Sequence, residues 1–92
     1  MILATRSWEL HLEGCQSLKD KRSVLQRLKS ALRKFNVSVS ETGHLDLWQR
    51  AELSCAVVGS DRRVVEETLR SVDRVVAEAD GVRVIDTVSS FR

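Results

Sequence analysis

The sequence contains no proline and no tyrosine, and it has only four glycines. Because few residues can interrupt a helix or strand, this composition favours regular elements joined by short turns over flexible linkers. No low-complexity stretch or internal repeat is visible. With 42% hydrophobic and 30% charged residues, we expect residues 1–92 to form one compact domain around a single core.

Long apolar runs are also lacking. Residues 1–12 carry Arg6 and Glu9 within an alternating pattern, which is typical of neither the apolar part of a signal peptide nor a membrane span. We therefore expect a cytoplasmic protein that has no membrane partner.

Cysteine is scarce, and the two cysteines are forty positions apart. No CxxC motif or histidine at ligand spacing accompanies them, so we expect no metal site, redox motif or cofactor. Cys55 shares the parity of Leu53 and Val57, which indicates a buried core residue. Cys15 precedes a cation-rich helix start, an environment that lowers a thiol pKa. Without a nearby base or resolving cysteine, we interpret Cys15 as a structural loop residue.

Hydrophobic periodicity divides the chain into six elements. The expected elements are a strand over residues 2–12, a helix from an N-cap at Ser17 to about residue 34 or 35, a strand over 36–41, a strand over 49–58, a second helix after Asp61 closed by Gly81, and a strand over 82–88. Each helix has a length suited to a right-handed crossover between two strands. The sequence therefore predicts an α+β fold, the ferredoxin-like βαββαβ sandwich, with a four-stranded antiparallel sheet in the order 4-1-3-2 and both helices on one face.

Two charged residues fall on the predicted inner layer. Even-numbered residues of the first strand point inward, among them Trp8 and Arg6, and we expect Arg6 to extend outward at the sheet end. On the first helix Lys21 lies within the apolar arc, and we expect its side chain to reach past the sheet edge into water. The rest of this arc comprises Leu18, Val24, Leu25, Leu28, Ala31, Leu32 and Phe35.

The second face of the sheet is predicted to be open, small and polar. It lacks the aromatic residues on which RNA-recognition sheets stack bases, so that mode of single-strand recognition is disfavoured. We expect Glu9 and Glu52 to be neighbours there and to form ion pairs with Arg50 or Arg83 rather than a catalytic pair. The predicted members are Thr5, Ser7, Glu9, His11, Ser38, Ser40, Arg50, Glu52, Ser54, Arg83, Ile85 and Thr87.

Positive charge is concentrated in the first helix. Residues 17–35 hold seven basic residues against one acid, whereas residues 61–80 hold six acids against four arginines. A row of cations at helical spacing can follow the phosphates of a nucleic acid, although a solvated helix face gives the same pattern. The candidate anion- or RNA-binding residues are Lys19, Lys21, Arg22, Lys29 and Arg33.

The connection over residues 42–48 is too long for a two-residue hairpin and too apolar for a plain solvated loop. We expect Leu45, Leu47 or Trp48 to pack onto the core or onto a partner. Trp48, with Gln49 and Arg50, is a candidate interface, while the simpler interpretation is that Trp48 closes one end of the core. His44 is interpreted as a hydrogen-bonding loop residue.

Three blocks of sequence together resemble one family. They are Ser17-Leu18-Lys19-Asp20-Lys21-Arg22-Ser23, Phe35-Asn36-Val37-Ser38-Val39-Ser40-Glu41 and Asp46-Leu47-Trp48-Gln49-Arg50-Ala51. In this order they are similar to the YlxP-like family of small bacterial proteins, also called domain of unknown function 503. The resemblance implies a ferredoxin-like fold and a bacterial cytoplasmic protein whose relatives are often encoded near translation and ribosome-maturation genes. It implies no activity.

Two main hypotheses follow. The first is a non-enzymatic accessory protein that binds structured RNA or a ribosomal particle through the basic first helix. The second is a homodimeric interaction or small-ligand-binding module that uses the open sheet face and the edge strand over residues 36–41. A third, an enzyme acting on an anionic substrate, rests only on the cationic helix start. No catalytic residue is assigned.

Overall fold

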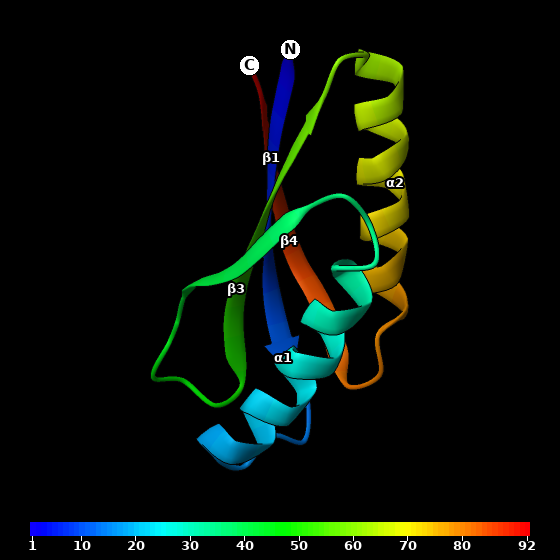
Figure 1. Cartoon of the computed structure of the whole chain (residues 1–92). Coiled ribbons are helices and arrows are strands. Elements are labelled where there is room, and N and C mark those ends of the chain that lie inside the picture. Colours follow the sequence, from blue (N-terminus) through cyan, green and yellow to red (C-terminus); the bar gives the residue numbers. More distant parts are fainter.

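The computed structural model describes all of residues 1–92 and has the predicted ferredoxin-like α+β fold (Figure 1). Its four strands form one antiparallel sheet in the order β2-β3-β1-β4, which is the predicted order. The elements are β1 (Ile2–Leu12), α1 (Leu18–Leu32), β2 (Ser38–Gly43), β3 (Arg50–Gly59), α2 (Arg62–Glu78) and β4 (Val82–Phe91). Neither helix combines the length and apolarity needed to cross a membrane.

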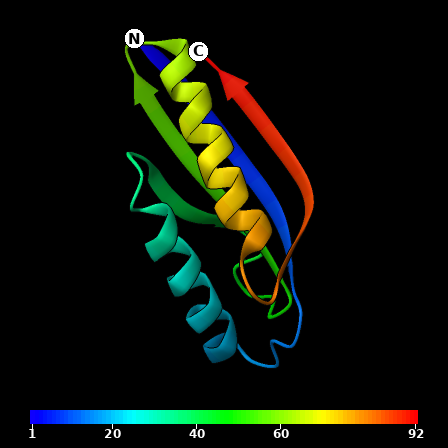
Figure 2. The ribbon, with the colours of Figure 1, turned by 90° about the vertical axis from the view of Figure 1, so that its right-hand side faces the viewer.

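Both helices cover the same face of the sheet, and β2 and β4 form its two edges (Figure 2). The two chain ends lie side by side, and the backbones of Leu3 and Arg92 exchange hydrogen bonds of 3.0 and 2.7 Å. The N-terminal end of α1 lies at the opposite end of the molecule (Figure 1). The fold therefore separates its termini from the start of α1.

The core lies between the sheet and the helices, as the periodicity predicts. The inward residues of β1 and β3 meet four buried residues of α2, Val65, Leu69, Val72 and Val76. The C-terminal half of α1 contributes the buried residues Leu25, Leu28 and Leu32, whereas Leu18 at its first turn is exposed. The remaining core residues are Ala4, Trp8, Leu10, Leu12, Cys15, Ala51, Leu53, Cys55 and Val57.

Several element boundaries differ from the prediction. The helix α1 ends at Leu32 with Arg33 as its C-cap, β2 begins two residues later than expected, and β4 continues to Phe91. The helix α2 ends at Glu78 with Ala79 as its cap, so Gly81, at φ 74°, serves the turn into β4 instead.

A β-bulge changes which residues of β4 face outward. Glu9 pairs with Asp86 but Leu10 pairs with Val84, which leaves one extra residue, Ile85, on β4. Beyond this point the alternation is inverted, and Thr87 pairs with the inward residue Trp8. The prediction that Thr87 lies on the open face was wrong, because it assumed unbroken alternation.

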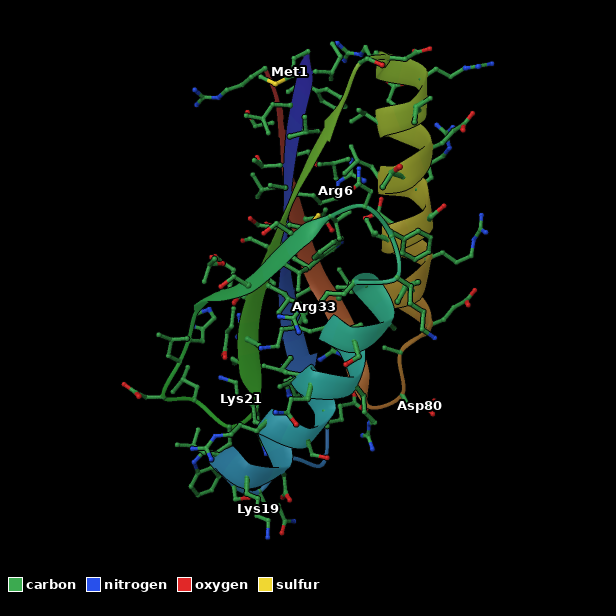
Figure 3. All side chains as sticks on the ribbon, in the orientation of Figure 1. Met1, Arg6, Lys19, Lys21, Arg33 and Asp80 are labelled. Atoms are coloured by element: carbon green, nitrogen blue, oxygen red, sulfur yellow. The ribbon has the colours of Figure 1, made fainter.

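The arginine on the inner layer is paired rather than extended outward. Arg6 lies between the sheet and α2 (Figure 3), where its guanidinium forms an ion pair with Asp73 and donates a 2.8 Å hydrogen bond to Ser89. The second oxygen of Asp73 accepts a 2.9 Å hydrogen bond from the indole nitrogen of the buried Trp8. Asp73 thus satisfies two polar groups that β1 places beneath α2.

We predict that Asp73→Ala lowers the free energy of unfolding by about 1–3 kcal/mol, because the buried indole N–H and the Arg6 guanidinium lose their acceptor. Urea denaturation followed by tryptophan fluorescence measures this loss. The matched control is Asp80→Ala, because Asp80 is exposed and forms no side-chain hydrogen bond or ion pair, so we expect a change within about 0.5 kcal/mol. Equal stabilities of the two variants would contradict the prediction.

Candidate nucleic-acid interface

A row of cations without acidic partners runs along α1. Lys19 and Arg22 are exposed, Lys29 is half-buried, and Arg33 is exposed at the C-cap. None of these four side chains forms an ion pair or hydrogen bond within the chain. At a rise of 1.5 Å per residue, the row extends over about 21 Å. We call Lys19, Arg22, Lys29 and Arg33 the basic stripe.

Lys21, predicted to belong with these residues, is buried instead. Its side chain is only 3% exposed and lies between α1 and the β2–β3 connection (Figure 3). Its ammonium nitrogen lies 2.8 Å from Oε2 of Glu41 and donates hydrogen bonds of 2.6 and 2.7 Å to the carbonyls of His44 and Leu47. The expectation that Lys21 reaches into water was wrong, because three oxygens surround its ammonium within the fold.

The contacts of Lys21 hold the β2–β3 connection, residues 44–49, against the first turns of α1. The connection is also closed on itself by a 3.1 Å hydrogen bond from the Leu47 amide to the His44 carbonyl. His44 has a left-handed backbone, with φ 57°, which turns the chain sharply after β2. This connection is therefore ordered, and it forms one continuous surface with the first turns of α1.

The start of α1 is closed by its own residues. The Ser17 hydroxyl accepts a 3.1 Å hydrogen bond from the Asp20 amide, and the Asp20 carboxylate accepts one of 3.1 Å from the Gln16 amide. This arrangement confirms the predicted cap. Because Asp20 already places a negative charge at the positive end of the helix, the basic stripe is the more favourable place for an anion.

Trp48 lies on the outside of this ordered connection. Its side chain is 51% exposed, so the interpretation that it closes one end of the core was wrong. The side-chain Nε2 of Gln49 donates a 3.3 Å hydrogen bond to the Cys15 carbonyl, and the backbone carbonyl of Gln49 accepts one of 2.8 Å from the Leu12 amide. Arg50 donates a 2.6 Å hydrogen bond to Glu9. Of the three predicted interface residues, Trp48 is therefore an exposed aromatic, whereas Gln49 and Arg50 form hydrogen bonds with other parts of the chain.

A groove of about 250 Å³ joins the connection to the basic stripe. Leu18 and Leu45 contribute apolar surface, and Arg22 and Lys29 supply cations. A second hollow, of about 310 Å³, is lined by residues 46–50 and includes Trp48. The surface around the start of α1 therefore combines positive charge with exposed apolar side chains.

The open face of the sheet carries a network of polar contacts around Glu9. Glu9 accepts hydrogen bonds from Arg50 and from His44, the latter at 2.5 Å. The hydrogen bond from Arg50 is the largest of the causes that hold the pKa of Glu9 below its usual range, and the contact with His44 adds to it. Burial acts in the opposite direction. The predicted Glu9–Arg50 ion pair and the hydrogen-bonding role of His44 are confirmed, whereas the predicted ion pair of Glu52 is wrong, because Glu52 accepts a hydrogen bond from Thr42 and Arg83 pairs with Glu13. No aromatic side chain lies on this face, as predicted from the sequence.

Both cysteines are buried core residues. Burial raises the pKa of the Cys15 thiol above its usual value, and it raises the pKa of Cys55 to about 11. The structural interpretation of Cys15 is confirmed, while the suggestion of a lowered pKa is wrong because burial outweighs the nearby Lys21.

The buried Lys21 contact is the site feature that sequence reasoning missed. Its signal was present, since Lys21 lies inside the apolar arc of α1 and Glu41 shares the inward parity of Val37 and Val39. Two opposite charges directed into one layer predict an ion pair between them.

The family comparison agrees with the sequence blocks. A family model described as "Protein of unknown function (DUF503)" matches residues 3–89. The chain belongs to this DUF503 family. A curated relative, "Uncharacterized protein YlxP" of Bacillus subtilis (strain 168), is 47% identical over 57 residues, which cover 61% of this chain and 62% of the relative. The match thus spans less than two thirds of the relative's length, and neither description states an activity.

One solved structure, which is 11% identical to this chain, supports the fold alone. The de novo designed protein Foldit4 matches with a TM-score of 0.59 and 11% identity, over 98% of this chain and 97% of that chain. A C-terminal segment of the alpha subunit of aIF2 from Pyrococcus abyssi gives a TM-score of 0.46 and 17% identity, over 99% of this chain and 48% of that chain. The weaker match, to the aIF2 segment, says nothing about the function of this chain.

We predict that Lys21→Met lowers the free energy of unfolding by about 3 kcal/mol, because it leaves the Glu41 carboxylate and two carbonyls without their cation. Urea denaturation measures the loss. The double variant Lys21→Met with Glu41→Leu should recover part of it, since the stranded charge is gone.

Lys19→Met is the matched control for this substitution, because Lys19 lies two residues away, is exposed and has no partner. We expect its stability to stay within about 0.5 kcal/mol of the unchanged chain. A Lys21→Met variant as stable as Lys19→Met would show that the buried contact contributes nothing.

Proposed function

We propose that this protein acts by binding rather than by catalysis, as an accessory protein that holds structured RNA, or a ribosomal particle, on the basic stripe of α1. The observation that carries the proposal is the absence of acidic partners along this stripe. Lys21 is the one basic residue of α1 that forms an ion pair, and it is buried. The exposed cations remain available to phosphates.

The distribution of charge over the two helices supports α1 as the binding element. Residues 17–35 carry seven cations and one acid, which gives a net charge of +6, whereas residues 61–80 carry four cations and six acids, which gives −2. Cations that neutralise phosphates release counterions, and this release favours binding at low salt. A polyanion therefore gains more from α1 than from α2.

The open sheet face is the less favourable surface for RNA. A hollow of about 160 Å³ on this face is lined by Ser7, Glu9, Glu52, Asp86 and Val88, so it presents three carboxyl side chains. Carboxylates repel phosphates, and no aromatic residue is available there for base stacking. The buried thiols and the paired Glu9 also argue against nucleophilic or acid–base chemistry.

Salt dependence tests the proposal. We predict that a ribosomal RNA stem–loop binds the protein and that the affinity falls steeply as KCl rises. The double variant Arg22→Gln with Lys29→Gln should reduce the slope of log K against log[KCl] by about two, because two phosphate contacts are lost. Fluorescence anisotropy of labelled RNA measures both quantities.

Arg63→Gln with Arg70→Gln is the matched control. These two arginines are exposed, form no ion pair, and have the same seven-residue spacing on α2. The α1 pair should change the slope and the α2 pair should not. Absent binding, salt-insensitive binding or equal effects of the two pairs would refute the proposal.

We also propose, as a second candidate function, self-association through β4. This edge strand has a free backbone edge, and all residues from 85 to 90 are exposed, including Val88 at 64%. The opposite edge, β2, has only six residues and carries a bulge near Gly43. A free edge with exposed apolar side chains favours strand addition by a second copy.

Light scattering after size exclusion tests self-association. For a dimer through β4 we predict a mass of about twice 10.4 kDa that Val88→Lys returns to 10.4 kDa. Val58→Lys is the control, because Val58 is also exposed but lies on β3, which β1 separates from β4. A mass of 10.4 kDa for the unchanged chain at high micromolar concentration would refute dimerisation.

A further inference from the structure

Trp48 is an exposed aromatic on an ordered support. The backbone on either side of it is held, by the hydrogen bond of Lys21 to the Leu47 carbonyl and by the contacts of Gln49 with Leu12 and Cys15. Its indole is nevertheless 51% exposed. A flat ring on fixed backbone loses little conformational freedom when a partner stacks on it.

The connection that carries this ring borders the basic stripe. The Leu47 carbonyl, one residue before Trp48, lies 2.7 Å from the ammonium of Lys21. Lys21 occupies the same turns of α1 as Lys19 and Arg22, so the connection that carries the indole borders the N-terminal end of the basic stripe. The groove lined by Arg22, Lys29 and Leu45 continues from this connection along α1.

We infer that the RNA held on the basic stripe contains an unpaired base, in a loop or bulge, that stacks on Trp48. This inference rests on the proposed function and names the class of RNA. The cations contact the backbone without regard to sequence, and the indole accepts any base because every base has a π face. Recognition would thus require a structured backbone and one unstacked base side by side.

The basic stripe and Trp48 contribute differently to RNA binding, so each can be tested separately. Phosphate contacts set the salt dependence, whereas stacking on a neutral ring contributes affinity without changing the number of counterions released. A fully paired RNA offers the phosphates but no free base. A protein partner would instead need acidic groups to pair with the cations and apolar groups to contact Trp48. An acidic amphipathic peptide therefore serves to distinguish a protein partner from RNA.

The experiment compares a ribosomal RNA stem–loop with a blunt duplex of the same stem sequence. Trp48→Ala should weaken binding of the stem–loop roughly 5- to 150-fold and leave the salt slope unchanged. Binding of the duplex should not change. Trp48→Phe should retain most of the affinity, and Trp48→Leu, which keeps apolar surface without a ring, should lose as much as Trp48→Ala.

Fluorescence provides a second readout in the unchanged protein. Trp8 is 1% exposed and its indole is bonded to Asp73, so only Trp48 is accessible to RNA. The stem–loop should quench the emission, while the duplex, and a stem–loop whose loop nucleotides are replaced by abasic linkers, should not. Leu47→Ala is the matched control for Trp48→Ala, because Leu47 is exposed next to Trp48 but has no aromatic ring. Its affinity for the stem–loop should stay close to that of the unchanged protein.

The outcomes separate the two proposals. If Trp48→Ala binds the stem–loop as tightly as the unchanged protein while Arg22→Gln with Lys29→Gln still lowers the salt slope, stacking is refuted and the basic stripe stands. Equal affinities of Trp48→Leu and the unchanged protein would replace stacking by an apolar contact and overturn the inference. If neither RNA binds but an acidic amphipathic peptide alters Trp48 emission, both proposals fail and the surface takes a protein.

Discussion

The arrangement of this surface depends on one buried ammonium group. Lys21 is the only charged residue in the buried set, and a cation removed from water requires oxygen partners at each of its three N–H groups. The Glu41 carboxylate and the carbonyls of His44 and Leu47 supply them. These partners come from β2 and from the connection that follows it, so satisfying one charge fixes how α1, β2 and the connection lie together.

Most of the fold could be predicted because its physical determinants are local. Alternation marks the strands, helical spacing marks the apolar arcs, and the order of elements with two crossovers leaves few sheet topologies. The error in assigning strand residues to a face arises where alternation is interrupted, at Ile85 in β4. A bulge inserts one residue without a compositional mark, so counting along the sequence assigns the following residues to the wrong face.

The candidate surface was less predictable because it depends on contacts between distant segments. The spacing of Lys19, Arg22, Lys29 and Arg33 was readable in the sequence, whereas Lys21 was grouped with them for its charge although it lies in the apolar arc. The difference between them is set by Glu41, twenty positions later, and by two backbone carbonyls that have no sequence signature. The backbone just before the exposed Trp48 is held by that same contact, through the Leu47 carbonyl, so the placement of the indole also depends on distant segments.

The adjoining ends of the chain have a practical consequence for anyone who handles this protein. Leu3 and Arg92 are hydrogen-bonded to each other at the end of the sheet opposite the start of α1 (Figures 1 and 2). A purification tag, a fluorescent fusion or a surface tether attached at either terminus therefore projects away from Lys19 and Trp48. Immobilised molecules would present α1 to the solvent in a common orientation, and joining the two ends through a short linker would create a circular chain without disturbing that face.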